Sequence, residues 1–328
     1  MPEVILDYME LHEIPQPIIR QDITTFLEYR FAQIQDKYTK ESYEFPPDWP
    51  GSEVLSALVE MAVPLFIFAA TLCRFIEDEA YSNPTDQLKK VLNYRKMKSD
   101  SEMDKLDATY SPVLKQLIDG RPEKAQKSLV KRFRIIVGTI VHLAEPLSPS
   151  SLASLLDIDG EQIQGQLSSL HSVLSVPSSA QSPIRMLHLS FRDFLVDADR
   201  RNKNFWVDEM ETHKMIMTKC LDQMSQQGYL QENICKLPDH GTLRAEIDSR
   251  TIANHLPPEV QYACRFWVYH LNESQTGISD NDPVYVFLQE HFLHWLESLS
   301  LLGRIAESIN LVWTLQTVVA CIYKPSLL

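Results

Sequence analysis

The chain has 328 residues, of which 44% are hydrophobic, 23% are charged and only nine are glycine. This composition excludes a disordered or collagen-like chain and favours a helical, globular protein of two or three domains. Lysine and arginine total 31 against 44 aspartate and glutamate residues, which gives a net charge of −13. Because that charge repels polyanions, we expect no general binding to nucleic acid or to an anionic membrane surface.

The apolar stretches and the cysteines indicate in which cellular compartment the protein is expected. The longest uncharged stretches, residues 61–73 and 308–323, are shorter than the roughly 20 residues that a membrane span needs. The N-terminus has no basic region ahead of an apolar segment, so no secretory signal is predicted. The five cysteines are odd in number and widely scattered, at Cys73, Cys220, Cys235, Cys264 and Cys321. We therefore expect a reducing, cytoplasmic location.

The first 45 residues are predicted to contain a short strand, residues 4–11, and one amphipathic helix with Asp22 near its start. The apolar stripe of this helix comprises Ile19, Ile23, Phe26, Leu27, Phe31 and Ile34. A strand and one helix cannot bury themselves, so residues 1–45 are interpreted as the remnant of an α/β core. Three prolines in residues 43–51 predict a break after it.

Residues 46–122 are predicted to form a helical domain. Ser52 is a candidate cap for a first helix, and Pro64 is placed at the opening of a second, which runs toward Phe75. Further helices are expected at residues 84–92 and 110–118. Together these segments predict a small helical bundle.

Residues 123–200 are predicted to form a winged-helix domain. A helix over residues 129–141 is followed by one that Ser148 caps and Pro149 opens, and by another at 160–170. Apolar alternation at 172–176 and 184–189 then predicts a hairpin. Residues 146–197 carry two arginines against five acidic residues, and residues 161–171 carry no lysine or arginine. Since phosphate neutralisation supplies most DNA affinity, we do not expect this domain to bind DNA.

Residues 201–328 are predicted to form a second helical domain, with helices at 206–224, 257–271 and 283–302 and an apolar helix near the C-terminus. The predicted fold class is therefore mainly α: a helical bundle, a winged helix and a second helical domain, after a remnant strand and helix of an α/β P-loop core.

The catalytic and metal-binding motifs that we sought are absent. No phosphate-binding loop, H-E-x-x-H, G-x-S-x-G or C-x-x-C pattern occurs, so we expect no enzyme activity and no nucleotide cradle. His291 and His294 share a helix and could hold a metal, but no third ligand is evident, so packed helix histidines are the simpler interpretation. Paired acids such as Glu209 and Glu211 are interpreted as solvated groups near helix ends.

Several strings, taken together, resemble fungal NACHT-domain proteins of the NLR-like signal-transduction ATPase class, also called STAND proteins. They are PLFIFAA (64–70), CRFI (73–76), LHSVL (170–174), LHLSFRDFL (187–195), QYACRFW (261–267) and HFLHWLE (291–297). The resemblance implies an order of P-loop ATPase core, helical domain, winged helix and second helical domain. This chain resembles the region from the end of that core onward, and the segment with the P-loop is expected to be missing from it.

The resemblance also implies roles for two residues. Pro64 matches a helical-domain proline that packs against the adenine ring, and His188 matches a winged-helix histidine that reaches the β-phosphate of the nucleotide in the inactive state. The alternative interpretations are an ordinary helix-opening proline and a hydrogen-bonded hairpin histidine. Because the phosphate cradle is absent, we expect no cofactor in this chain alone, whereas complete relatives bind ADP or ATP.

Two functional hypotheses follow from these expectations. The first is a non-catalytic regulatory and oligomerisation module of a NACHT-type signalling protein, which acts as a latch over ADP in complete relatives. The second is a truncated gene product or stand-alone helical scaffold that binds proteins without nucleotide control. In both cases the expected partners are proteins, including further copies of the chain.

Overall fold

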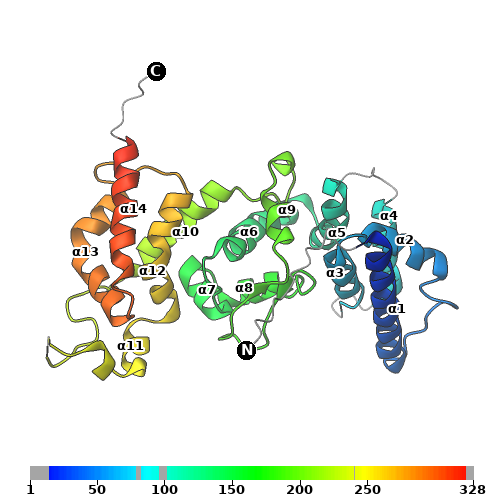
Figure 1. The fold of residues 1–328 in the computed structure, drawn as a ribbon, viewed down its shortest axis with the longest axis horizontal. Helices are drawn as coiled ribbons and strands as arrows, with labels where there is room; N and C mark the ends of the chain where they lie inside the picture. The colour runs from blue at the N-terminus through cyan, green and yellow to red at the C-terminus, as the bar shows by residue number, and fades with distance from the viewer. Residues whose placement is uncertain (1–14, 79–82, 96–101, 240, 323–328) are drawn as a thin grey trace, which may run out of the picture. The chain divides into compact units, whose positions relative to one another are not determined.

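The computed structural model describes residues 15–78, 83–95, 102–239 and 241–322 (Figure 1). The chain divides into two compact units. Unit 1 contains the chain up to residue 122 together with residues 169–175 and 187–194, and unit 2 contains the rest. Within these residues the structure is mostly helical, with two strands of two residues each, so the predicted mainly α fold class is confirmed. The strand expected at residues 4–11 lies outside the described residues.

Unit 1 is a bundle of helices around α3 (Phe66–Ile76). The first helix, α1 (Gln16–Lys40), packs against α2 (Ser52–Ala62) and α3, and α3 packs in turn against α4 (Pro84–Arg95) and α5 (Glu102–Gln116). The buried face of α1 recurs every three or four residues, as an amphipathic helix requires, at Ile19, Ile23, Leu27, Phe31, Ile34 and Tyr38. The four helices that follow the break confirm the predicted bundle.

Three predicted details at helix starts of unit 1 are wrong. The helix α1 begins at Gln16 after Pro15, so Asp22 lies well inside it rather than near its start. Gly51, not Ser52, precedes α2, because Ser52 is already helical. Pro64 does not open α3, because Leu65 has an extended backbone and the helix begins only at Phe66. Propensity places a helix start less accurately than the helix itself.

The predicted hairpin is shorter than the alternation of apolar residues suggests. The strands β1 (Leu174–Ser175) and β2 (Arg185–Met186) have two residues each. Just outside them, the backbone N–H of Leu187 donates to the carbonyl of Val173 at 3.1 Å. The chain then enters α9 (Ser190–Val196), a helix that was not predicted. In unit 1 its Phe191 and Phe194 pack on Tyr110 of α5, with ring centroids 5.1 and 5.2 Å apart.

Unit 2 begins with three helices at the predicted places: α6 (Glu123–His142), α7 (Pro149–Leu156) and α8 (Gly160–Leu167). Ser148 caps α7 as predicted, since its side chain accepts a hydrogen bond from the N–H of Ser151. The winged helix stays a prediction, since residues 169–175 and 187–194 belong to unit 1 and the rest of residues 123–200 to unit 2. The four domain boundaries stay predictions.

The centre of unit 2 is the pair α10 (Glu209–Met224) and α12 (Pro258–Glu273). Around it lie α11 (Ser249–His255), α13 (Pro283–Leu301) and α14 (Glu307–Ile322), and short 3-10 turns occur at Ala198–Arg200 and Arg244–Glu246. Trp267 and Trp295 are fully buried in this core, and the indole N–H of Trp295 donates to the carbonyl of Cys264 at 2.7 Å. Among the described residues, none of these helices is long and apolar enough to cross a membrane.

Candidate functional site

His188 lies at the entrance of α9 and forms part of a short hydrogen-bonded chain in unit 1. Its Nδ1 atom is 3.1 Å from the backbone nitrogen and 2.8 Å from the hydroxyl of Ser190. That hydroxyl lies 2.7 Å from the hydroxyl of Tyr110 on α5. The prediction that His188 is a hydrogen-bonded residue next to the hairpin agrees with this geometry.

The donors around His188 determine which ring nitrogen carries the proton. The backbone N–H of Ser190 can only donate, so Nδ1 of His188 accepts, and the neutral ring carries its hydrogen on Nε2. The hydroxyls then run in one direction, from Tyr110 to Ser190 to His188. Since His188 is exposed, its Nε2–H is oriented by the protein and available to an acceptor outside it. A phosphate oxygen is one such acceptor.

Pro64 lies in the turn between α2 and α3 and is partly buried. A proline ring offers an apolar surface and no donor, which suits a contact with a flat apolar ring. Pro64 and His188 belong to the same unit but to different segments of the chain. Their roles toward a nucleotide therefore stay predictions.

The histidine pair His291 and His294 has the geometry of packed side chains. Their Nδ1 atoms are 3.5 Å apart, and His291 stacks at 5.6 Å on Phe287 in the same helix. Within the described residues, this pair is not part of a group of three side chains that could hold a metal ion. The simpler interpretation, made from the sequence, fits these contacts.

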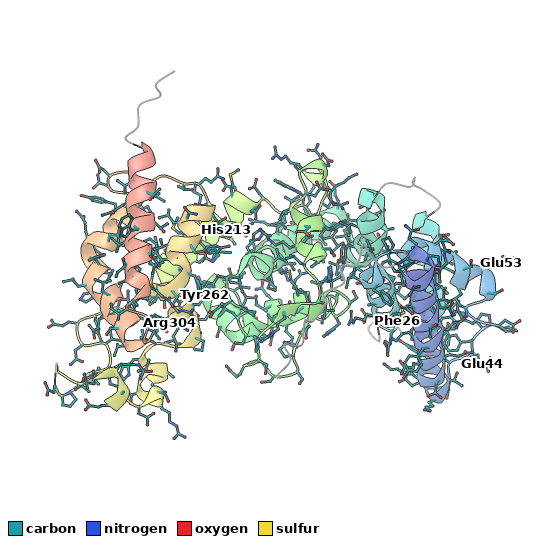
Figure 2. All side chains as sticks on the ribbon, in the orientation of Figure 1. Phe26, Glu44, Glu53, His213, Tyr262 and Arg304 are labelled. Carbon is teal, nitrogen blue, oxygen red and sulfur yellow. The ribbon has the colours of Figure 1, made fainter. Side chains whose placement is uncertain are left out.

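A buried network of histidines in unit 2 was missed by the sequence analysis. His213 of α10 and His270 of α12 meet through their Nδ1 atoms at 2.8 Å, and Nε2 of His270 lies 2.7 Å from the hydroxyl of Tyr262 (Figure 2 labels His213 and Tyr262). That hydroxyl also accepts a hydrogen bond from the N–H of Ala144 at 3.1 Å. Burial, with the neighbouring histidines His213 and His142, lowers the pKa of His270 to about 3, so this ring is neutral at physiological pH.

One signal in the sequence could have pointed to this region, which is the four-residue spacing of Glu209 and His213. Residues four apart lie on one face of a helix, so these two side chains were bound to point the same way from α10. His142, the last residue of α6, lies next to His213 and brings a third helix to this group of histidines. Its contact with α10 depends on tertiary packing, and a sequence pattern does not specify which helices pack together.

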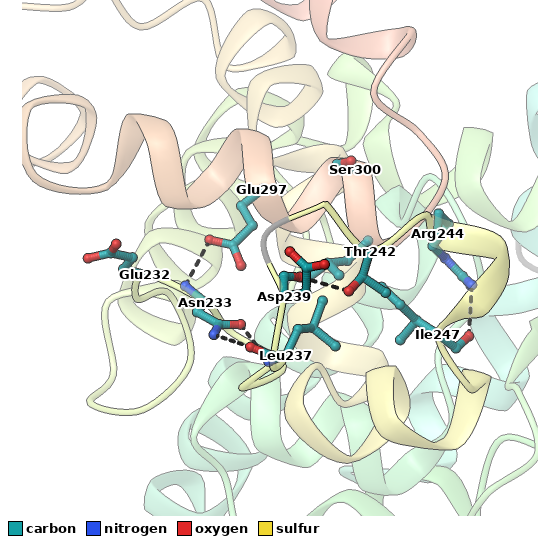
Figure 3. A pocket seen from close by; sticks show the side chains of 10 residues that line it. Glu232, Asn233, Leu237, Asp239, Thr242, Arg244, Ile247, Glu297 and Ser300 are labelled. Atoms are coloured by element: carbon teal, nitrogen blue, oxygen red, sulfur yellow. Dashed lines mark hydrogen bonds between the residues drawn. The ribbon is translucent and has the colours of Figure 1, made fainter.

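A cavity of about 240 Å³ in unit 2 lies beside the loop between α10 and α11 (Figure 3). Its wall includes Glu297, whose carboxylate accepts hydrogen bonds from the N–H groups of Ile234 at 2.8 Å and Asn233 at 3.2 Å. The side chain of Asn233 in turn closes a turn by hydrogen bonds to both backbone groups of Leu237. Because these polar groups are engaged in stabilising the loop, they do not form an evident catalytic arrangement in the cavity.

The chain is similar in sequence to a curated protein from a fungus. The chain is 26% identical, over 236 residues, to the vegetative incompatibility protein HET-E-1 of Podospora anserina. The match covers 65% of this chain but only 16% of the relative. No protein-family profile and no solved structure matches the chain. The chain is therefore similar to a limited part of a fungal vegetative incompatibility protein, about one sixth of its length.

Proposed function

We propose that the chain is a non-catalytic regulatory and oligomerisation module of a NACHT-type signalling protein. The observation that carries the proposal is the similarity to HET-E-1, because it extends over 65% of the chain rather than one short motif. The helical architecture of both units is compatible with it. In this proposal the partners are proteins, and the location is cytoplasmic.

The proposed mechanism is a two-state latch. The helical domain and the winged helix close over ADP that a P-loop core holds, and they open when the nucleotide is exchanged. His188 contributes a hydrogen bond from its outward Nε2–H to a phosphate oxygen in the closed state, and Pro64 packs on the base. The hydroxyl chain from Tyr110 supports this role, since it holds the ring in one tautomer before the ligand arrives.

The second candidate function is a protein-binding scaffold, which the outer surface of α13 and α14 favours. Leu293, Ile309 and Trp313 are 75, 63 and 69% exposed. An apolar groove of about 430 Å³ lies nearby between the two helices and includes Phe292 and Leu315. Apolar patches of this kind promote association. If this candidate is correct, Trp313→Ser reduces self-association in light scattering and leaves the helical content unchanged.

The two candidates differ in their dependence on nucleotide. A charge-assisted hydrogen bond contributes about 1.5 to 3 kcal/mol, and one buried apolar contact adds a similar amount. Micromolar affinity requires about 8 kcal/mol after the costs of association. Two such contacts therefore do not hold ADP tightly without a phosphate cradle, so the latch needs a P-loop core.

Calorimetric titration with ADP and Mg²⁺ tests the proposal on two proteins, the chain alone and the chain joined to the P-loop core of a NACHT-type protein. We expect no micromolar binding by the chain alone, and binding by the fusion that is tighter than binding by the isolated core. If the isolated core and the fusion bind ADP equally, the chain does not act as a latch and the scaffold becomes the better proposal.

A further inference from the structure

His142, Glu209 and His213 bring three metal-binding side chains together in unit 2, away from His188. One ligand atom from each, a ring nitrogen or a carboxylate oxygen, lies within 4.8 Å of the other two. His142 and His213 are buried, whereas the side chain of Glu209 is 43% exposed. Within the described residues, this is the group of three or more such side chains that the geometry brings together. We propose that these three residues bind a divalent transition-metal ion such as Zn²⁺.

The packing of α6 on α10 places the three ligands. Glu209 and His213 are one turn apart on α10, so both side chains lie on the same face of that helix. His142 is the last residue of α6, and its ring lies edge-on to that of His213 with centroids 5.0 Å apart. The absence of a side chain at Gly138 lets α6 approach α10 and the segment just before it. A Cβ at Gly138 would lie 3.2 Å from Val207, before α10, and 3.6 Å from the hydroxyl of Thr212 on α10.

The distances are close to those of a tetrahedral zinc site. Zinc binds nitrogen and oxygen at about 2.0 to 2.2 Å, so two ligand atoms of one tetrahedral ion lie roughly 3.4 Å apart. Nε2 of His142 and Oε1 of Glu209 are already 3.8 Å apart. Side-chain rotations that move ligand atoms by about 1 Å complete the geometry. Two histidines and one carboxylate leave a fourth position for water, on the side where Glu209 reaches solvent.

The groups behind the ligands orient them as in known metal sites. Nδ1 of His142 is 2.7 Å from the carbonyl of Gly138, which can only accept, so Nδ1 carries the proton and the Nε2 lone pair faces the site. Nδ1 of His213 is 2.8 Å from Nδ1 of His270. Histidine ligands characteristically donate their second ring N–H to such a partner, which fixes the ring and makes the ligand more basic.

Metal binding selects one direction for the hydrogen bonds behind His213. When Nε2 of His213 holds the metal, its Nδ1–H donates to His270, and the Nε2–H of His270 donates to the hydroxyl oxygen of Tyr262. Without metal, the same three groups can run in the opposite direction, from the hydroxyl of Tyr262 through His270 to His213. The network therefore accommodates both states without breaking a hydrogen bond between these residues.

A metal here would join the end of α6 to the start of α10, which are separated in the sequence by α7, α8, the hairpin and α9. The net charge of −13 also favours a cation over an anion. The competing explanation is a purely structural network, in which His142 and Glu209 pair through a proton. Only the metal site predicts that the chain binds metal stoichiometrically and that this binding depends on Glu209.

The test uses the full chain, freed of metal by a chelator, with Zn²⁺ and Co²⁺ as probes. Zinc affinity is measured by competition with a chromophoric chelator, and the visible absorption of Co²⁺ reports tetrahedral coordination. The test variant is Glu209→Gln, which removes an anionic ligand from a partly exposed position and is expected to leave the fold intact. Glu211→Gln is the matched control for charge on the same helix, and the double variant of His291→Gln with His294→Gln excludes the other histidine pair.

We expect one Zn²⁺ per chain and a tetrahedral Co²⁺ spectrum, with affinity at least about tenfold weaker in Glu209→Gln and unchanged in both controls. Three results would each overturn the proposal. These are no stoichiometric binding by the wild-type chain, equal affinity in Glu209→Gln, or loss of binding in the double histidine variant. Circular dichroism of each variant establishes that its fold is intact.

Discussion

The close approach of α6 and α10 at Gly138 gives the sharpest prediction about stability. Glycine inside a helix costs about 1 kcal/mol relative to alanine, so replacing it with alanine in open space stabilises the protein. At Gly138 the added Cβ meets Val207 at 3.2 Å, a distance at which the neighbour must move by a few tenths of an ångström. The packing of Val207, two residues before α10, therefore opposes the gain in helix propensity.

The magnitudes decide the sign of this effect. Overpacking a well-packed core costs about 1 to 3 kcal/mol, so Gly138→Ala is expected to destabilise the chain by up to about 2 kcal/mol after the propensity gain of about 1 kcal/mol. Gly165 in α8 is the matched control, because nothing lies within 4 Å of a Cβ placed there. Gly165→Ala is expected to stabilise the chain by about 0.5 to 1 kcal/mol.

Urea denaturation followed by circular dichroism measures both variants against the wild-type chain. The expected result is opposite signs, with a lower midpoint for Gly138→Ala and a higher one for Gly165→Ala. If Gly138→Ala stabilises the chain as much as Gly165→Ala, the two helices do not pack closely at this point. Their packing would then not position His142 against α10.

Two further predictions concern the cores. Burial raises the pKa of the Cys73 and Cys264 thiols to about 12, so neither should react with a thiol reagent at pH 8 until the chain unfolds. Peptide mapping after labelling checks this, and rapid labelling of either in the folded chain would contradict it. Trp295→Phe removes the hydrogen bond to the Cys264 carbonyl and should cost about 1 to 3 kcal/mol in urea denaturation. The exposed Trp313→Phe should cost less than about 0.5 kcal/mol, and equal costs would refute the packing described for Trp295.

Helix starts were predictable where the signal is local. Ser148 before Pro149 combines a capping side chain with a proline at the first helical position, and this cap forms as expected. Asp282 before Pro283 has the same local pattern and likewise caps α13. Pro64 lacked such a cap, and the helix after it begins two residues later at Phe66. A proline alone indicates that a helix begins nearby, but it does not determine at which residue the helix begins.

The helix α9 was missed because its start competes with the strand pattern ahead of it. Residues 184–189 alternate in hydrophobicity, and this pattern conceals the shift to a helical period at Phe191 and Phe194. What stabilises the helix is the contact of these rings with Tyr110, from a distant part of the sequence. Short helices of this kind depend on tertiary packing more than on their own propensity.

The candidate sites, like the helices, were predictable only where the signal is local in the sequence. His188 could be selected from a resemblance in sequence, but its orientation by Ser190 and Tyr110 depends on the packing of α9 against α5. The histidine network of unit 2 was not predicted, because His142, His213 and His270 belong to three helices. Its chemistry exists only after α6, α10 and α12 have packed together.

The most direct test of the latch is the ADP affinity of the chain joined to a NACHT-type P-loop core, measured by calorimetry for the wild type and for His188→Ala. Loss of one charge-assisted hydrogen bond of about 1.5 to 3 kcal/mol predicts affinity weaker by about tenfold or more. The exposed His171, replaced in His171→Ala, is the matched control and should leave the affinity unchanged. An affinity for ADP that is the same in His188→Ala and in the wild type would contradict the account.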